Sequence, residues 1–100
     1  MLKKKRLEIH YCTGCKWLLR AGWMAQEILS TFENDLEEVA IVPADGGRFQ
    51  IILENTVIWD RKREGGFPQP AELKARVRDA IDPDRAIPHI DQAASRQGSR

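Results

Sequence analysis

The feature that most constrains the fold is a change of hydrophobic period around residues 12–16. Before it, Leu7, Ile9 and Tyr11 alternate with polar residues, which is the period-2 pattern of a strand with one buried face. After it, "KWLLRAGWMAQEILSTF" predicts a helix, because its apolar residues recur at three- and four-residue steps. The apolar face of that helix comprises Leu18, Ala21, Ala25, Ile28, Leu29 and Phe32. A strand that leads directly into a helix is the first half of a β-α-β unit.

The rest of the chain predicts three more strands and a second helix. "LEEVAIV" is followed by the turn-forming "PADGG", and "RFQIIL" is joined to "TVIWDRK" by Glu54-Asn55, where asparagine tolerates the left-handed conformation of a tight hairpin. Pro70 opens the second helix, which ends at Asp82. The order β-α-β-β-β-α predicts an α/β (α+β) fold with one mixed four-stranded sheet, covered by both helices, whose first two strands are parallel.

The second helix is expected to have a short buried face and a charged outer face. Its predicted buried residues are Leu73, Val77, Ala80 and Ile81, and those predicted to stay in water are Lys74, Arg76 and Arg78. The chain of 100 residues fits one domain, expected over residues 1–92. The polar residues 93–100 are expected to form a flexible tail.

Composition excludes several classes of function. The net charge is +1, whereas a nucleic-acid binder usually carries a large basic excess, so no nucleic-acid partner is expected. No apolar stretch approaches the length of a membrane span, and Glu8 and His10 interrupt the apolar region that a signal peptide needs. We therefore expect a cytoplasmic protein without membrane contact. In that reducing compartment, a cysteine pair is more often catalytic, redox-sensing or metal-binding than a structural disulfide.

The two cysteines, Cys12 and Cys15, form a CxxC motif between the first strand and the first helix. A thiolate is the reactive form of cysteine, and a helix N-terminus favours it. Gly14 leaves backbone N–H groups open, and Lys16 adds a positive charge. We expect Cys12 to lie at the open strand–helix junction and Cys15 to lie one turn into the helix, covered by neighbouring leucines. The motif in this position predicts thiol–disulfide exchange with Cys12 as the attacking thiol.

Two other interpretations of the pair are weaker. A zinc site within one chain needs four ligands, whereas the sequence offers two cysteines, His10 and the distant His89. Two chains sharing a metal could supply four thiolates, and the two cysteines could also be small buried apolar residues. A c-type haem is excluded because Lys16 occupies the position that needs histidine. We expect neither a metal nor a cofactor.

Several residues near the motif are candidate substrate contacts. Trp17 can offer a flat surface, although packing is the commoner role of such a tryptophan, and Trp23 and Trp59 are expected in the core or on a sheet face. The run 60–63, "DRKR", is typical of a solvated strand end but could hold carboxylates of an acidic thiol, and "GGFP" indicates a turn with its phenylalanine in the core. The candidate binding residues are Gly14, Lys16, Trp17, Gly47, Arg61 and Phe67.

The segments "IHYCTGCKW", "DGGRFQI" and "VIWDRKREGGFPQPAELKARVRDAI" resemble the selenoprotein W, T and H (Rdx) family, in particular its bacterial cysteine-containing selenoprotein W-like members. The resemblance covers residues 6–92. It implies a thioredoxin-like fold and a thiol oxidoreductase linked to glutathione and antioxidant defence. Cys15 matches the position that is selenocysteine in many animal members, which favours Cys15 as the attacking atom, whereas its expected burial favours Cys12.

One departure from thioredoxins and one alternative function follow from the same residues. Thioredoxins place a cis-proline before the strand that faces the motif, whereas here that strand follows "DGGR" and Pro43 lies too early. This favours glutathione or a dedicated protein thiol or disulfide partner over broad protein-disulfide reduction. The alternative is a redox-sensing interaction module without turnover, with "WDRKREGGFP" as its contact surface. The sequence permits a homodimer without requiring one.

Overall fold

The structure is a computed structural model that describes residues 4–91, so the predicted tail lies outside the described residues. Its strands are β1 (Lys5–Cys12), β2 (Leu36–Ala44), β3 (Phe49–Leu53) and β4 (Thr56–Asp60), and its helices are α1 (Leu18–Phe32), α2 (Arg61–Glu64) and α3 (Pro70–Ile81). Residues 88–91 form one further helical turn. The predicted order is confirmed, with the short α2 added between β4 and α3.

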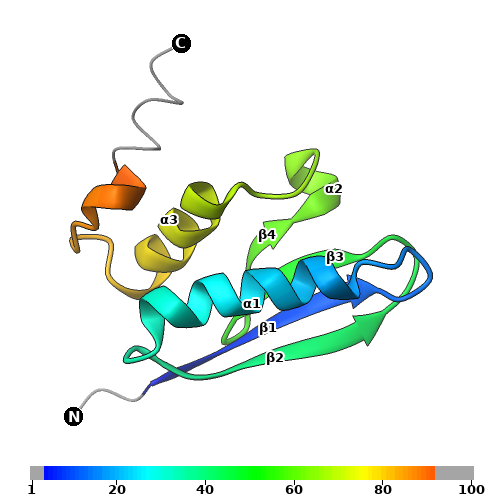
Figure 1. Ribbon diagram of the computed structural model, residues 1–100, viewed down its shortest axis with the longest axis horizontal. Coiled ribbons are helices and arrows are strands. Elements are labelled where there is room, and N and C mark those ends of the chain that lie inside the picture. Colours follow the sequence, from blue (N-terminus) through cyan, green and yellow to red (C-terminus); the bar gives the residue numbers. More distant parts are fainter. Residues whose placement is uncertain (1–3, 92–100) are drawn as a thin grey trace.

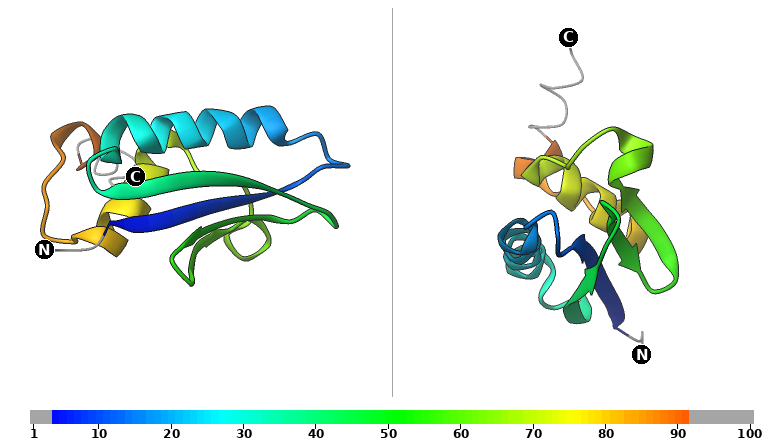
Figure 2. Two further views of the ribbon diagram at one scale, coloured as in Figure 1. Left: turned by 90° about the horizontal axis from the view of Figure 1, so that it is seen from below. Right: turned by 90° about the vertical axis from the view of Figure 1, so that its right-hand side faces the viewer.

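The sheet has the strand order β2-β1-β3-β4, with the N-terminal strand inside it (Figure 1). β1 pairs with β2 in parallel and with β3 antiparallel, and β3 pairs with β4 antiparallel. The predicted mixed four-stranded sheet and its parallel first pair are therefore confirmed. Helices α1 and α3 pack against each other on one face of the sheet (Figure 2), and the arrangement is a thioredoxin-like α+β fold.

The core lies between that face of the sheet and the two helices. Alternate residues of β1 and β3 point into it, as the period-2 patterns predict. Its fully buried residues include Leu7, Ile9, Phe49, Ile51, Met24, Ile28, Phe32, Leu73 and Val77. Because the core strand β1 ends at Cys12, the packing of the core fixes where the cysteine motif begins.

The opposite face of β1 is polar. His10 lies with a ring nitrogen 2.8 Å from a carboxylate oxygen of Glu8, which also pairs with Arg6. Partial burial, together with the positive charges of Arg48 and Arg6, lowers the pKa of His10. This face carries neither α1 nor α3, so the strand has one apolar and one polar side, as the sequence predicts.

The hairpin and the second strand differ in detail from expectation. The hairpin between β3 and β4 is confirmed, but its left-handed residue is Glu54 (φ 56°), not Asn55. Strand β2 continues through Pro43 to Ala44 instead of stopping before the proline. Proline is tolerated there because β2 is an edge strand, whose outward N–H groups need no partner.

Helix α3 begins as predicted and packs less apolar surface than predicted. Pro70 is its first residue, and Gln69 and Glu72 form a capping box at its N-terminus. Leu73 and Val77 are buried, whereas Ala80 is exposed, so the predicted buried face is too wide. The prediction that its basic residues stay in water is wrong for Lys74 and Arg78, whose side chains are 11% and 12% exposed, whereas that of Arg76 is 37% exposed. All three pair with carboxylates.

Candidate active site

Cys12 and Cys15 are joined as a disulfide, with their Cα atoms 5.2 Å apart. Cys12 is the last residue of β1, and residues 13–16 form the turn that follows it. The turn is held to the neighbouring strand by Thr13, whose backbone N–H and side-chain hydroxyl both donate to the carbonyl of Ala44, at 3.0 and 3.2 Å. The redox pair therefore lies at one end of the sheet, with its first sulfur in the strand and its second in the turn.

The relative exposure of the two cysteines is opposite to the prediction. Cys12 is 3% exposed, whereas Cys15 is exposed. The reason is that α1 begins at Leu18 and not at Lys16, which adopts a left-handed conformation (φ 63°) instead. Cys15 thus lies on the turn before the helix, not one turn into it, and no leucine covers it.

The backbone of the turn points at the buried sulfur. The N–H of Cys15 donates to Sγ of Cys12 at 3.2 Å, and the N–H of Trp17 lies 3.5 Å from the carbonyl of Cys12. A backbone N–H directed at sulfur stabilises negative charge there. Cys12 is therefore suited to leave as a thiolate when an incoming thiolate attacks the exposed sulfur of Cys15.

An aromatic cluster packs next to the cysteine turn. Trp17 packs edge-on against Phe49 and Phe67, with ring centroids 6.2 and 5.0 Å away, and the two phenylalanines are 5.0 Å from each other. Such perpendicular contacts are favourable beyond the area that they bury. Trp17 is half-buried, so it packs as well as bordering the site. Trp59 is buried, as predicted, whereas Trp23 is 41% exposed and the prediction for it is wrong.

Arg61 connects this cluster to the loop between β2 and β3. Its guanidinium lies over the ring of Trp17, 5.0 Å from the centroid, and donates to the carbonyl of Gly47 at 3.1 and 3.3 Å. The adjacent Lys62 donates to the carbonyl of Gly46 at 3.1 Å. Three of the predicted binding residues, Trp17, Gly47 and Arg61, thus meet at one place, and Phe67 lies directly behind them.

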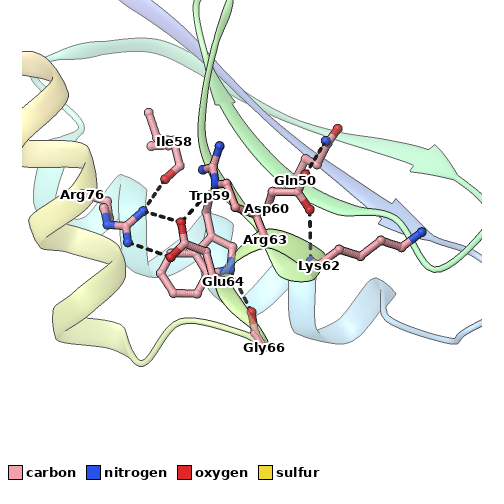
Figure 3. A network of polar contacts seen from close by, with 9 residues as sticks. All are labelled: Gln50, Ile58, Trp59, Asp60, Lys62, Arg63, Glu64, Gly66 and Arg76. Carbon is pink, nitrogen blue, oxygen red and sulfur yellow. Dashed lines mark hydrogen bonds and ion pairs between the residues drawn. The ribbon is translucent and has the colours of Figure 1, made fainter.

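Arg61 is the first residue of the short helix α2, and Figure 3 shows the polar contacts around that helix. The prediction of a solvated strand end for "DRKR" is wrong, because Asp60 caps a helix here by accepting from the N–H of Lys62, and Gly65 (φ 82°) ends it in the left-handed conformation. Gln50 donates to the same aspartate at 3.1 Å, which is the main reason why the pKa of Asp60 is lowered.

Helix α3 anchors the other side of α2. Arg76 donates to both carboxylate oxygens of Glu64, at 3.0 and 3.1 Å, and to the carbonyl of Ile58. These hydrogen bonds lower the pKa of Glu64. The indole N–H of Trp59 donates to the carbonyl of Gly66 at 3.0 Å. The segment "WDRKREGGFP" is therefore held by hydrogen bonds and an ion pair. It places Arg61 and Phe67 against Trp17, which lies two residues after Cys15.

Sequence reasoning did not predict a hollow next to the cysteine turn. Gly14 and Lys16 are exposed on the turn. A shallow and mostly apolar hollow beside them is lined by Tyr11, Thr13, Lys16, Leu18 and Leu19. Leu18 was assigned to the apolar face of the first helix, and that prediction is wrong because it is 51% exposed. Leu19 was not part of the predicted face and is 87% exposed.

Two other classes of site can be checked against the described residues. Within residues 4–91, no three His, Cys, Asp or Glu side chains are grouped so that they could hold a metal ion. Over the same range, none of the helices has both the length and the apolar character required to cross a bilayer.

A thioredoxin-like sheet with a CxxC disulfide at the end of its first strand defines a class of thiol redox proteins. The chain belongs to the Rdx family, whose family model matches residues 6–79. No curated protein matches the chain.

Solved structures that are similar to it include the following two. A protein of Bordetella parapertussis is 56% identical, with a TM-score of 0.77, over 79% of this chain and 100% of that chain. A selenoprotein W-related protein of Vibrio cholerae is 51% identical, with a TM-score of 0.77, over 80% of this chain and 100% of that one. Family membership and the cysteine pair together indicate a redox-related role, and the family is consistent with a protein or thiol partner.

Proposed function

We propose that this protein is a thiol–disulfide oxidoreductase that uses Cys12 and Cys15, linked to glutathione and acting in the cytoplasm. The observation that carries the proposal is the asymmetry of the pair: Cys15 is exposed on the turn, whereas Cys12 is buried at the end of β1. An attacking thiol needs access, whereas a resolving thiol needs only to reach the first sulfur. We therefore assign attack to Cys15 and resolution to Cys12. This assignment agrees with the family resemblance, because Cys15 matches the position that is selenocysteine in many animal members.

The reaction balances as two successive exchanges. In the reduced protein, the Cys15 thiolate attacks one sulfur of a substrate disulfide, forms a mixed disulfide and expels the other half as a thiolate. The Cys12 thiolate then attacks Sγ of Cys15, forms the intramolecular disulfide and releases the second half, which takes up a proton. Two electrons pass from the protein to the substrate. An external thiol such as glutathione returns them by the reverse exchange, in which Cys12 leaves as a thiolate that the N–H of Cys15 stabilises.

The charges near the motif support an acidic thiol as one partner. Lys16, Arg20 and Arg61 form no ion pair with a carboxylate among residues 4–91. Cations without a partner attract carboxylates at long range and speed the encounter, an effect that salt screens. Glutathione carries two carboxylates, so its reaction with the protein is expected to slow as the ionic strength rises.

Single-cysteine variants test the assignment. Glutathione disulfide added to reduced Cys12→Ser should leave a stable glutathione adduct on Cys15, because no second thiol remains to resolve it. The Cys15→Ser protein should react far more slowly, because its one thiol is buried. Intact mass spectrometry measures both adducts. An adduct that forms readily only in Cys15→Ser would reverse the roles, and no adduct in either variant would exclude glutathione as a partner.

Turnover separates catalysis from redox sensing. Wild-type protein, glutathione and a coupled glutathione reductase should reduce a small disulfide catalytically, many times per protein molecule. A disulfide that forms once and alters binding without turnover would instead support the redox-sensing module. Cys15→Ser is the matched control, because it lacks the attacking thiol, whereas in Cys12→Ser free glutathione can still release the group bound to Cys15.

A further inference from the structure

We propose that the start of α1 forms a docking surface for a protein substrate in which the reacting cysteine is flanked by apolar and acidic residues. The proposal rests on the proposed function, because it concerns the partner of the same exposed sulfur. The α1 docking surface consists of Lys16, Leu18, Leu19, Arg20 and Trp23.

The apolar part of this surface is unusually open to solvent. Leu19 is 87% exposed, Leu18 is 51% exposed and Trp23 is 41% exposed. Leu19 and Trp23 are four residues apart and so lie on the same side of the helix. Isolated exposed leucines are ordinary, but contiguous apolar side chains around a reactive atom are typical of interaction sites.

The surface begins at Lys16, the residue that follows the reactive cysteine. The hollow lined by Tyr11, Thr13, Lys16, Leu18 and Leu19 lies between the cysteine turn and the first turn of α1. Cys15 directly precedes Lys16 and is itself exposed. A chain that presents its sulfur to Cys15 can therefore place a neighbouring apolar side chain in the hollow and extend over Leu19 to Trp23, which is farther than a small thiol reaches.

The charge of the surface selects the partner. Lys16 and Arg20 are exposed, and neither forms an ion pair within residues 4–91. Arg20 is placed over the ring of Phe67, 4.1 Å from its centroid. The segment 11–26 contains no acidic residue. Acidic residues of a partner complement this surface, whereas a second copy of the chain would place cations against cations.

Two synthetic peptide disulfides and one small disulfide test the proposal. Each peptide has leucine on one side of its cysteine, and the flanking charged residues are glutamates in one and lysines in the other. Bis(2-hydroxyethyl) disulfide is neutral and too small to reach α1. The measurement is the second-order rate constant for oxidation of the reduced protein, expressed as the ratio of each peptide to the small disulfide.

The acidic peptide should react about tenfold faster than the basic one at low ionic strength, because each 1.4 kcal/mol of favourable contact gives a factor of ten. Leu19→Ser should lower the ratio for the acidic peptide about fivefold, since partial burial of one leucine side chain contributes about 1 kcal/mol. Arg20→Glu should remove the preference for the acidic peptide. Leu29→Ser is the matched control, with the same change on the same helix about 15 Å further along its axis.

The outcomes separate this proposal from the one on which it rests. Normal reaction with the small disulfide, with ratios unchanged in Leu19→Ser and Arg20→Glu, would overturn the docking surface alone. Failure of the wild-type protein to react with any of the three disulfides would overturn the proposed function, and the docking surface with it. A concentration-dependent dimer that Leu19→Ser abolishes would identify a second copy as the occupant and would also overturn the proposal.

Discussion

The two ends of the molecule use their arginines differently. At the cysteine end, Arg20 and Arg61 lie over aromatic rings and form no ion pair with a described carboxylate. At the far end, Arg85 donates to both carboxylate oxygens of Asp35, at 2.8 and 2.9 Å, and Arg78 pairs with Asp91. Aromatic rings hold a guanidinium without cancelling its charge, whereas carboxylates cancel it. The cysteine end thus keeps a positive charge available for a partner, and the far end uses its charge to join segments of the chain.

The largest effect is expected at the centre of the aromatic cluster. Phe67→Ala removes the contacts with Trp17, Phe49 and the guanidinium of Arg20, and should lower the free energy of unfolding by about 2 kcal/mol. Urea unfolding measures this loss. The rate at which a small thiol reduces the Cys12–Cys15 disulfide should also change. An unchanged unfolding midpoint would show that the cluster does not support the cysteine end.

The next effect concerns two adjacent glycines in the loop that Arg61 holds. Gly47 has φ 75°, and a Cβ atom there would lie 3.3 Å from the guanidinium of Arg61, whereas Gly46 (φ 65°) has open space around it. Gly46→Ala should lower the free energy of unfolding by about 1 kcal/mol, because alanine is strained in the left-handed conformation. Gly47→Ala should cost more, because it adds the close contact. Equal losses in urea unfolding would contradict the close contact in solution.

A smaller effect is expected when the guanidinium itself is removed. Arg61→Met loses the hydrogen bonds to the carbonyl of Gly47 and the contact with Trp17, and should destabilise the protein by about 1 kcal/mol. It should also reduce the salt dependence of the reaction with glutathione disulfide. Lys62→Met is the control, because it loses one exposed hydrogen bond and should change stability by less than about 0.5 kcal/mol.

The smallest effect is expected at the far end, and it depends on pH. The hydrogen bonds from Arg85 lower the pKa of Asp35 below its ordinary value of 3.8. A lowered carboxyl pKa gives stability that is present above the ordinary pKa and is lost as the pH falls through the folded-state pKa. Arg85→Met should therefore lower the free energy of unfolding by about 0.5 kcal/mol at neutral pH, and this loss should shrink as the pH falls through the folded-state pKa of Asp35. A loss that does not change across an acid titration would show that it comes from packing and not from the ion pair.

The fold was largely predictable because the strands and helices of this chain have clear hydrophobic periods. Leu7, Ile9 and Tyr11 define β1, and Pro70 defines the start of α3, so local patterns and the crossover rule together gave the sheet. Helix α2 was not predictable in the same way. Its four residues are all charged, so it has no apolar periodicity, and its boundaries depend on a cap by Asp60 and a left-handed Gly65.

The position of the cysteine pair in the fold was predictable from the sequence, whereas its local geometry was not. The CxxC spacing identified both cysteines, and the structure brings Trp17, Gly47, Arg61 and Phe67 together as candidate neighbours. The exposure of Cys15 was missed because the residue that delays the helix is Lys16. Glycine is the usual signal for a left-handed position, and a lysine there gives no sign in the sequence.

The central place of β1 in the sheet has a consequence for synthesis of the protein on the ribosome. Both neighbours of β1 come later in the chain, since it pairs with residues 36–44 and 49–53. At about 5–20 residues per second, β1 and the cysteines that follow it emerge seconds before the strands that enclose them. During that interval Cys12 lacks the shelter it has in the folded domain. The nascent chain therefore exposes both cysteines to the thiols and disulfides around it. Once the sheet is complete, only Cys15 stays exposed.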